Sequence, residues 1–568
     1  MANRVIVQAL LVGVLWCPLA PAAEVVRRLP VADYIDHMQG GWIGQMAGVG
    51  WGAPTEFKTV AAIIPEAQMP AWNPEMVNQH GNDDLYVEMT FLKSLADYGL
   101  GVPIRQAGID FANSGYGLWH ANLAGRDNLR QGIAPPDSGH PRFNAHADDI
   151  DYQIEADFSG LIAPGLPNQA IALGEIFGRL MNYGDGLYGG QFVGGMYAEA
   201  FFEADPVKLV EFGLRCIPAQ SQYAECVRDV LAWSRENPDD WTRTWQKVED
   251  KYQKNPAYRR FSCDKGAFNI DAKINGAYIV MGLLYGRGDL DRTLTIACRC
   301  GQDSDCNPAN AGGILFAALG ASKIPARFTE KLNAPALFYS TPYSLPKVYE
   351  VCLALARAAV LKAGGRLETD AAGAEVFVIP TQTPMPSAFE PCWAPGPAAQ
   401  SRFTPEELAR IKPPPPPVQR CAPADIAAAV QPFAPGWTAQ DCGADMAPGL
   451  RPQWGGRTNV LVTHPLSSET GCVLSRQVPV PADRKTALHL VVANDPRGDF
   501  ELVVRGNGKD LRRQTVAVNN DTKQDGWLDL TVDLSPFAGR TVTLEVVNQP
   551  TGWAFEAAYW ASLTIETP

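Results

Sequence analysis

Two short acidic clusters, about 220 residues apart in a chain of 568, are the segments best suited to chemistry. The first is Asn82-Asp83-Asp84 and the second is Asp303-Ser304-Asp305. Each follows a glycine-marked turn and precedes a helical pattern, so a fold that joins the two turns would gather four carboxylates. Four carboxylates cannot all stay ionised a few ångströms apart unless a cation compensates them. The two clusters together therefore predict a divalent cation site.

The expected ion is Mg²⁺, one or two per chain, with Ca²⁺ or Mn²⁺ as alternatives. Carboxylate and amide oxygens without a nearby histidine pair favour these hard cations over zinc. A structural alternative is open for each cluster, because Asn82 can cap a helix with acids in its first turn and Asn307-Pro308 can begin another. The expected ligands are Asn82, Asp83, Asp84, Asp303 and Asp305.

Several segments, in the same order along the chain, resemble the ADP-ribosylglycohydrolase family. Residues 44–57, GQMAGVGWGAPTEF, resemble its glycine-rich helix and turn. Asn82-Asp83-Asp84 is similar to its Thr-Asp-Asp triplet, and residues 301–307, GQDSDCN, to its Gly-x-Asp-Thr-Asp-Thr-Asn element. Residues 154–165 and 184–190 resemble central segments of more distant, often secreted members. The resemblance extends over about residues 31–365.

This resemblance implies an all-α catalytic domain, over residues 24–368, that hydrolyses a glycosidic bond. In the family the metal grips vicinal hydroxyls of a ribofuranose and positions water against the anomeric carbon, through an oxocarbenium-like state. Glu56 matches the family's acidic residue after the glycine-rich turn and is the candidate acid/base or substrate-gating residue. The resemblance assigns catalysis to Glu56, Asp83, Asp84 and Asp303, and substrate contact to Asp157, Asp185, Tyr188 and Gly189.

Three positions depart from the family pattern. Val49 stands where an Asp usually follows glycine, Asn82 replaces a Thr, and Cys306 replaces the last Thr or Ser. An Asn oxygen can still ligate a hard ion, whereas a Cys sulfur is a poor Mg²⁺ ligand. The number of ions is therefore open between one and two.

The amino terminus has the pattern of a secretory signal peptide. Arg4 precedes an apolar run from Val5 to Trp16, and a small-residue segment ends at Ala22 or Ala23. We therefore expect residues 1–23 to be removed and the protein to be secreted or periplasmic. No other apolar run of about 20 residues follows, and the net charge of −13 disfavours nucleic acid and anionic membrane as partners. The expected partner is a carbohydrate substrate.

Sequence periodicity divides the remaining chain into three parts. Helical patterns dominate to about residue 365, at 168–181, 192–202, 206–214, 222–234, 275–284 and 349–361. The glycines at 44, 48, 50 and 52 follow no strand pattern, so we interpret them as close helix packing and not as a dinucleotide fingerprint. A proline-rich linker is expected over 369–420, with stiff polyproline II at 413–417.

Beyond residue 421 the apolar period changes to two, which is typical of strands. Strands are expected at 487–492, 500–504, 528–534, 541–546 and 559–565, in a jelly-roll-like β-sandwich over 421–568. Such a unit could bind carbohydrate through tryptophan rings or only support the catalytic unit, since tryptophan in a sandwich is more often core. The rings concerned are Trp437, Trp454, Trp527, Trp553 and Trp560.

The sequence thus predicts a secreted, metal-dependent glycoside hydrolase that cleaves a furanosidic or diol-bearing bond in a glycan. Removal of ADP-ribose from a protein or small molecule is one alternative, and metal-dependent sugar binding without catalysis is another. His146 beside Asp148-Asp149 is open between a metal or base role and a solvated loop residue. Cys216 with Cys226, or Cys442 with Cys472, are candidate disulfides in an oxidising compartment.

Overall fold

The computed structural model describes residues 25–412, 421–467, 470–518, 524–552 and 555–567. The chain forms two compact units that divide between Pro414 and Pro415. The expected signal peptide at 1–23 and the five prolines at 413–417 lie outside the described residues. Among the described residues, no helix is both long and apolar enough to span a membrane.

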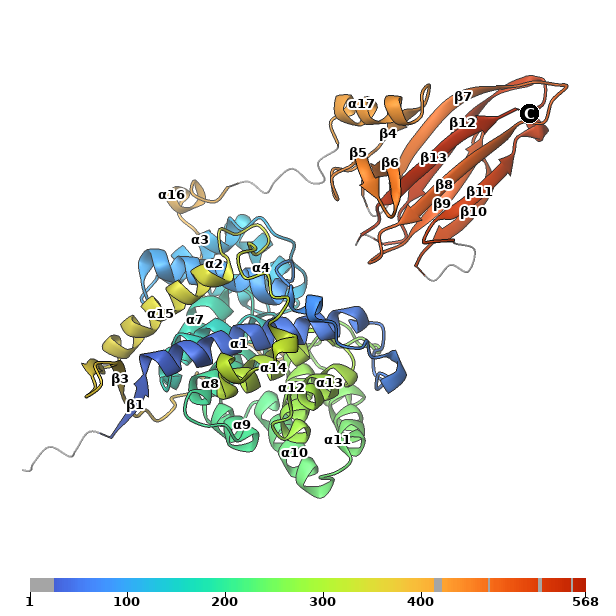
Figure 1. Cartoon of the computed structure of the whole chain (residues 1–568). Coiled ribbons are helices and arrows are strands. Elements are labelled where there is room, and N and C mark those ends of the chain that lie inside the picture. The colour runs from blue at the N-terminus through green and yellow to red at the C-terminus, as the bar shows by residue number, and fades with distance from the viewer. Residues whose placement is uncertain (1–24, 413–420, 468–469, 519–523, 553–554, 568) are drawn as a thin grey trace, which may run out of the picture. The chain divides into compact units, whose positions relative to one another are not determined.

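The N-terminal unit is helical, as predicted (Figure 1). The expected helices appear within four residues of their predicted bounds, except that the helix expected from residue 192 begins at Asp185. The helices are α1 (Val31–Gly52), α2 (Asp83–Tyr98), α3 (Ile104–Ala112), α4 (His120–Arg130), α5 (Asp151–Ile154), α6 (Asp157–Leu161), α7 (Pro167–Phe177), α8 (Asp185–Ala200), α9 (Pro206–Arg215), α10 (Gln222–Glu236), α11 (Trp241–Val248), α12 (Ala272–Gly286), α13 (Leu290–Arg299), α14 (Cys306–Leu319), α15 (Leu345–Lys362) and α16 (Pro405–Leu408). One continuous apolar core joins most of them.

Helices α1 and α14 pack backbone to backbone and run side by side in Figure 1. A Cβ atom on Gly48 would lie 2.2 Å from the carbonyl oxygen of Pro308, and one on Gly52 would lie 1.9 Å from that of Ser304. Gly44 is similarly crowded. Real Cβ atoms do not approach an oxygen so closely, so only glycine permits this contact. The prediction that these glycines serve close helix packing is confirmed.

A small sheet and an extended segment complete the N-terminal unit, and neither was expected. The strands β1 (Val26–Pro30), β2 (Arg366–Thr369) and β3 (Glu375–Pro380) are antiparallel, with β3 in the middle. After β3 the chain stays on the helices: Arg105 pairs with Glu407, and Asp137 accepts backbone hydrogen bonds from Ala399 and Ser401. The structure therefore differs from the linker expected from residue 369, because the segment as far as α16 has polar partners on the helical unit.

The C-terminal unit is a sandwich of two antiparallel five-stranded sheets, in agreement with the predicted β-sandwich (Figure 1). One sheet has the order β10-β9-β12-β7-β4 and the other β11-β8-β13-β6-β5. Alternate apolar residues of both sheets face one core, which a short helix, α17 (Pro423–Phe433), also covers. The strands are β4 (Thr438–Gln440), β5 (Gly449–Trp454), β6 (Arg457–Thr463), β7 (Cys472–Val480), β8 (Ala487–Asn494), β9 (Phe500–Gly506), β10 (Lys509–Val516), β11 (Leu528–Asp533), β12 (Arg540–Gln549) and β13 (Ala558–Glu566).

The tryptophans of the sandwich divide between two apolar clusters. Trp437 and Trp560 are buried in the core that both sheets share, and Trp527 is buried in a second cluster with Tyr559. Trp454 is half-buried and stacks on Tyr559, with ring centroids 3.7 Å apart. The side chain of Trp553 lies outside the described residues.

No disulfide joins the cysteines of the described part of the chain. Cys216 and Cys226 are both buried free thiols and do not form the candidate disulfide. Cys442 and Cys472 are also free, but their side chains hydrogen-bond to each other. The second candidate pair therefore lies close together in the fold.

The contact between α1 and α14 gives a direct stability test. Replacing Gly48 with alanine should destabilise the helical unit by about 1–3 kcal/mol, because the added methyl group overpacks a backbone contact that cannot yield. This loss opposes the higher helix propensity of alanine. Urea unfolding followed by far-ultraviolet circular dichroism measures the change. Gly101→Ala is the matched control, since a Cβ at Gly101 meets no atom within 4 Å; an equal loss there would contradict the packing argument.

Candidate metal and catalytic site

Three segments far apart in the sequence meet at the acidic clusters. The Asn82 side-chain nitrogen donates to Asp305 Oδ2 at 3.1 Å, which joins the start of α2 to the start of α14. The Cys306 thiol lies 3.0 Å from Asp84 Oδ1 and makes a second connection. The Thr55 and Ser304 hydroxyl oxygens are 2.9 Å apart, and they bring in the turn after α1. The structure thus brings the two clusters together, next to Glu56.

Local sequence rules fix where the acids lie on their helices. Asn82 is the N-cap of α2 and accepts the backbone hydrogen bond of Asp84 at 2.9 Å. Asp83 and Asp84 therefore occupy the first turn of that helix, and Asp305 is the N-cap residue of α14. Both helix N-termini carry partial positive charge, which favours carboxylates at these positions.

The acids differ in exposure. Asp84, Asp303 and Asp305 are buried, Asp83 is half-buried and Glu56 is exposed at the edge of the cluster. A molecule from solvent therefore meets the carboxylate of Glu56 first, and the buried acids lie behind it.

The crowding of these acids raises their affinity for protons. Burial, with repulsion from Asp305, raises the pKa of Asp83 to about 7. Desolvation, with repulsion from Asp305 and Asp83, raises the pKa of Glu56 to about 9. The pKa values of Asp84 and Asp303 are also raised well above the usual range, first by burial and then by Asp305. The cluster therefore needs protons or a cation to compensate its charge.

The donor set fits a hard divalent cation. Asp84 Oδ2 and Asp303 Oδ1 are buried and have no hydrogen-bond partner, although buried polar atoms normally have one. Ligand atoms of Asp303, Asp305 and Cys306 lie within 4.8 Å of one another. Free carboxylate oxygens beside half-buried Asp83 are the ligands that Mg²⁺, Ca²⁺ and Mn²⁺ accept.

Two of the departures from the family pattern have structural roles here. The Asn82 oxygen caps α2 and its nitrogen reaches Asp305, so this side chain holds the two clusters in register and keeps one oxygen lone pair for an ion. The Cys306 thiol contacts one oxygen of Asp84 and leaves the other free. Ligation by Asn82 stays a prediction.

A second polar layer under the acids was not anticipated from the sequence. Glu88, one turn beyond Asp84 on α2, accepts hydrogen bonds from Gln45 Nε2 and from the backbone nitrogen of Phe158, each at 2.6 Å. Gln45 also donates to the carbonyl oxygen of Asp84, at 3.2 Å. The sequence feature that could have predicted this layer is Glu88 itself, an acid four residues after Asp84 and so on the same face of the helix. This layer fixes the depth of α2 beneath the site.

The four predicted substrate-contact residues are all buried. Asp157 lies in the second layer, where it accepts a hydrogen bond from Asn310 at 2.9 Å, and it is one of the charges that act on Asp84. Asp185 begins α8 and accepts the backbone hydrogen bond of Tyr223. The Tyr188 hydroxyl donates to Ala388 on the extended segment, and Gly189 is packed against Gln153. Their roles toward substrate stay predictions.

Three solved structures of low sequence identity are among those similar to parts of this chain. The chain is similar to a structure described as an ADP-ribosylglycohydrolase-related protein complex, at 15% identity over 58% of this chain and 99% of that chain, with a TM-score of 0.38. It is also similar to the CBM22-1 xylan-binding domain from Paenibacillus barcinonensis Xyn10C, at 15% identity over 24% of this chain and 87% of that one, with a TM-score of 0.18. A third is TmCBM61 in complex with beta-1,4-galactotriose, at 17% identity, 24% and 90% coverage and a TM-score of 0.18.

Comparison of sequences decides the family. No curated protein sequence matches the chain. The profile of the family described as ADP-ribosylglycohydrolase matches residues 30–367, which is more than half of the 568 residues and covers Glu56 and both acidic clusters. This chain therefore belongs to the ADP-ribosylglycohydrolase family of hydrolases.

Proposed function

We propose that this protein is a secreted, metal-dependent glycoside hydrolase that cleaves a diol-bearing, furanosidic bond in a glycan. One observation carries the proposal: an exposed carboxyl, Glu56, stands at the edge of a cluster of buried carboxylates assembled from three segments. The signal-like sequence at residues 1–23 supports a substrate outside the cytoplasm. Hydrolysis of an ADP-ribosyl bond is the alternative within the same family chemistry.

Glu56 is the general acid/base in this proposal. Its carboxyl is the exposed member of the cluster, so it is the one that a glycosidic oxygen can approach. Desolvation is the first cause of the raised pKa of Glu56, and it favours a protonated carboxyl that can give its proton to a leaving group. After bond cleavage the same carboxylate can accept a proton from water.

Asp83, Asp84, Asp303 and Asp305 would hold the divalent cation, with Asn82 as a further oxygen donor. When bound, such an ion orients hydroxyl groups and lowers the pKa of water. Mg²⁺ is the proposed ion, with Ca²⁺ or Mn²⁺ as alternatives. Asp84 and Asp303 supply buried, unpaired oxygens, and Asp83 supplies the half-buried carboxylate nearest to solvent.

Two exposed aromatic side chains support a sugar-like substrate. Tyr339, 57% exposed, donates its backbone hydrogen bond to His80, two residues before Asn82. Trp119, 56% exposed, follows Gly117, whose carbonyl oxygen accepts the hydroxyl hydrogen bond of Tyr86 on α2. Both rings are thus tied to the segment that carries the first acidic cluster. Such rings offer apolar faces to a sugar or a base.

The substrate class can be tested directly by product release. The purified mature protein is incubated with plant and bacterial polysaccharides, aryl furanosides and ADP-ribosyl-arginine, each with Mg²⁺ and with EDTA. We expect release of sugar from a glycan or furanoside that EDTA abolishes. Release from ADP-ribosyl-arginine alone would select the alternative, and no release from any substrate would contradict both.

Two substitutions separate the acid/base from the ion site. Glu56→Gln should lower kcat by about 10²–10⁴-fold with little effect on Mg²⁺ binding, because only proton transfer is lost. Asp305→Ala should lower both activity and Mg²⁺ affinity, since it removes a buried charge of the cluster. Steady-state kinetics and calorimetric Mg²⁺ titration measure the two effects. Unchanged turnover in both variants would show that this cluster is not the catalytic site.

The pH dependence of stability reports on the ion site. Folding raises the pKa of Asp83 to about 7 and that of Glu56 to about 9, so the metal-free folded protein keeps protons that the unfolded chain releases above about pH 4. The contribution of these two carboxyls to the stability of the metal-free protein is therefore fully present below about pH 4 and is lost as the pH rises through 7 to 9. A cation compensates the same carboxylates, so the rise in Tm on replacing EDTA with MgCl₂ should be larger near pH 8 than near pH 5.

Differential scanning fluorimetry measures this Mg²⁺-dependent rise in Tm. The Asp303→Ala variant serves as the comparison, because it removes one buried carboxylate with an unpaired oxygen. The rise should disappear in this variant. A rise that is independent of pH, or that survives in Asp303→Ala, would mean that Mg²⁺ binds elsewhere.

The aromatic residues give a binding test. Trp119→Ala should raise KM by about 2- to 12-fold with kcat nearly unchanged, which corresponds to the 0.5–1.5 kcal/mol of an aromatic contact. Tyr98→Ala is the matched control, because Tyr98 is also exposed but ends α2 at its opposite terminus. Equal KM values for the wild-type protein and Trp119→Ala would exclude this ring from substrate binding.

A further inference from the structure

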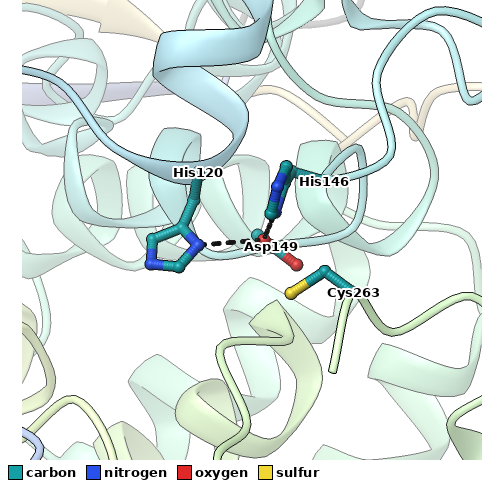
Figure 2. Close-up of side chains that lie close together, drawn as sticks. All are labelled: His120, His146, Asp149 and Cys263. Atoms are coloured by element: carbon teal, nitrogen blue, oxygen red, sulfur yellow. Dashed lines mark hydrogen bonds and ion pairs between the residues drawn. The ribbon is translucent and has the colours of Figure 1, made fainter. Parts of the chain in front are cut away.

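A second group of potential metal ligands lies in the helical unit, apart from the acidic clusters. Figure 2 shows the side chains of His120, His146 and Cys263 directed at the carboxylate of Asp149. His146 Nδ1 is 2.6 Å from Asp149 Oδ2, and His120 Nδ1 is 3.6 Å from the same oxygen. One ligand atom from each of the four residues lies within 4.8 Å of the other three.

One oxygen of the Asp149 carboxylate has no hydrogen-bond partner. This oxygen is Oδ1, and the side chain of Asp149 is 0% exposed. Imidazoles with a free ring nitrogen are metal ligands. A cation placed among these side chains would satisfy Asp149 Oδ1.

A neighbouring acidic group differs in having a buried cationic side chain, although Asp148 Oδ1 and Asp271 Oδ1 also have no hydrogen-bond partner. Asp148 and Asp271, which lie close to Asp149, both pair with the buried ammonium of Lys273, at 3.6 and 3.1 Å. The Ser262 hydroxyl also donates to Asp271. These acids therefore have a resident cation, whereas both histidines approach Asp149 Oδ2 and its Oδ1 has no hydrogen-bond partner.

The shape of the group distinguishes a metal site from a catalytic triad. In a cysteine–histidine–aspartate triad the imidazole lies between the thiol and the carboxylate. Here both imidazoles and the thiol converge on one carboxylate, as the dashed lines and the sulfur in Figure 2 indicate. Convergence of four donors on one point is what a tetrahedral ion requires.

We propose that His120, His146, Asp149 and Cys263 bind one Zn²⁺ ion. Two imidazole nitrogens, one carboxylate oxygen and one thiolate form a tetrahedral zinc set, and the sulfur selects against Mg²⁺ and Ca²⁺. Cys263 is exposed and the histidine side chains are 27% and 32% exposed, so an ion can enter from solvent. This inference is independent of the proposed glycosidase activity.

The ion would tie a long connection to the helices. Cys263 lies between Gln253 and Ala272, a stretch whose only helical turn is at Pro256–Tyr258. Arg259 folds this loop on itself through the carbonyl oxygens of Gly266 and Phe268, at 2.7 and 2.9 Å. The zinc ligands would add a cross-link from the loop to α4 and to the segment before α5.

The loop also reaches the acidic site. The ring of Phe268 stacks on His120, with centroids 5.8 Å apart, and packs against Phe57 at 5.2 Å. Phe57 follows Glu56 directly. His120 itself has a φ of 41°, a backbone conformation that persists where surrounding structure holds a side chain in a required position. Zinc bound by these four residues would therefore help to fix the position of Phe268 and, through it, of Phe57 next to Glu56.

Cobalt titration tests the site without relying on activity. The reduced, metal-stripped full chain is titrated with Co²⁺ under nitrogen and followed by absorption spectroscopy. We expect one equivalent to give a thiolate-to-cobalt charge-transfer band and strong tetrahedral bands, which Zn²⁺ abolishes and Mg²⁺ does not. Absence of the charge-transfer band in the wild-type protein would overturn the proposal.

Variants assign the bands to the named ligands. Cys263→Ser should lose the charge-transfer band, and His146→Gln should weaken Zn²⁺ binding by at least about 100-fold, beyond the loss that an outer-shell partner causes. Cys421→Ser, a partly exposed thiol in the sandwich, and Asp303→Ala should keep the bands. Circular dichroism confirms that each variant is folded. A charge-transfer band that persists in Cys263→Ser would also overturn the proposal.

Discussion

The helical unit depends on a contact between two backbones with no side chain between them. Glycines along one face of α1 let it lie against α14 at distances that any Cβ atom would prevent. The last of these glycines, Gly52, meets the carbonyl oxygen of Ser304, between the two acids of the second cluster. The turn after α1 is therefore held at the start of α14, and this is what places Glu56 beside Asp305. The close packing of α1 on α14 therefore also determines the geometry of the acidic site.

That constraint has an electrostatic cost, which the surrounding polar groups limit. Two helix N-termini point toward the acids, and Asn82, Gln45 and Glu88 fix the depth and register of α2. These groups orient the carboxylates without neutralising them, as the raised pKa values of Asp83 and Glu56 indicate. The carboxylates of the two clusters are thus held in place and keep free oxygens for a cation.

The sequence anticipated features that local chemistry determines. Apolar period located α10, α12 and most of α8, together with the strands β8, β9, β11, β12 and β13, and motif spacing located the acids. It did not anticipate Glu88, whose partners Gln45 and Phe158 come from two other segments, or the extended segment after β3, whose prolines suggested a free linker. Sequence separation conceals such contacts, since Cys263 and His120 carry no shared motif and meet only through tertiary structure.

The middle strand of the small sheet has a consequence for where this catalytic unit ends. The family match stops at residue 367, yet β3, at Glu375–Pro380, lies between β1 and β2 and supplies every hydrogen bond that either makes within the sheet. A fragment that ends at residue 367 would lack β3, so β1 and the shortened β2 would have no partner strand, and the buried contact of Cys392 with the carbonyl oxygen of Tyr183 would be lost. The segment that matches the family is therefore shorter than the compact helical unit. About forty residues after the match, as far as α16, hold β1, β2 and the helices in place.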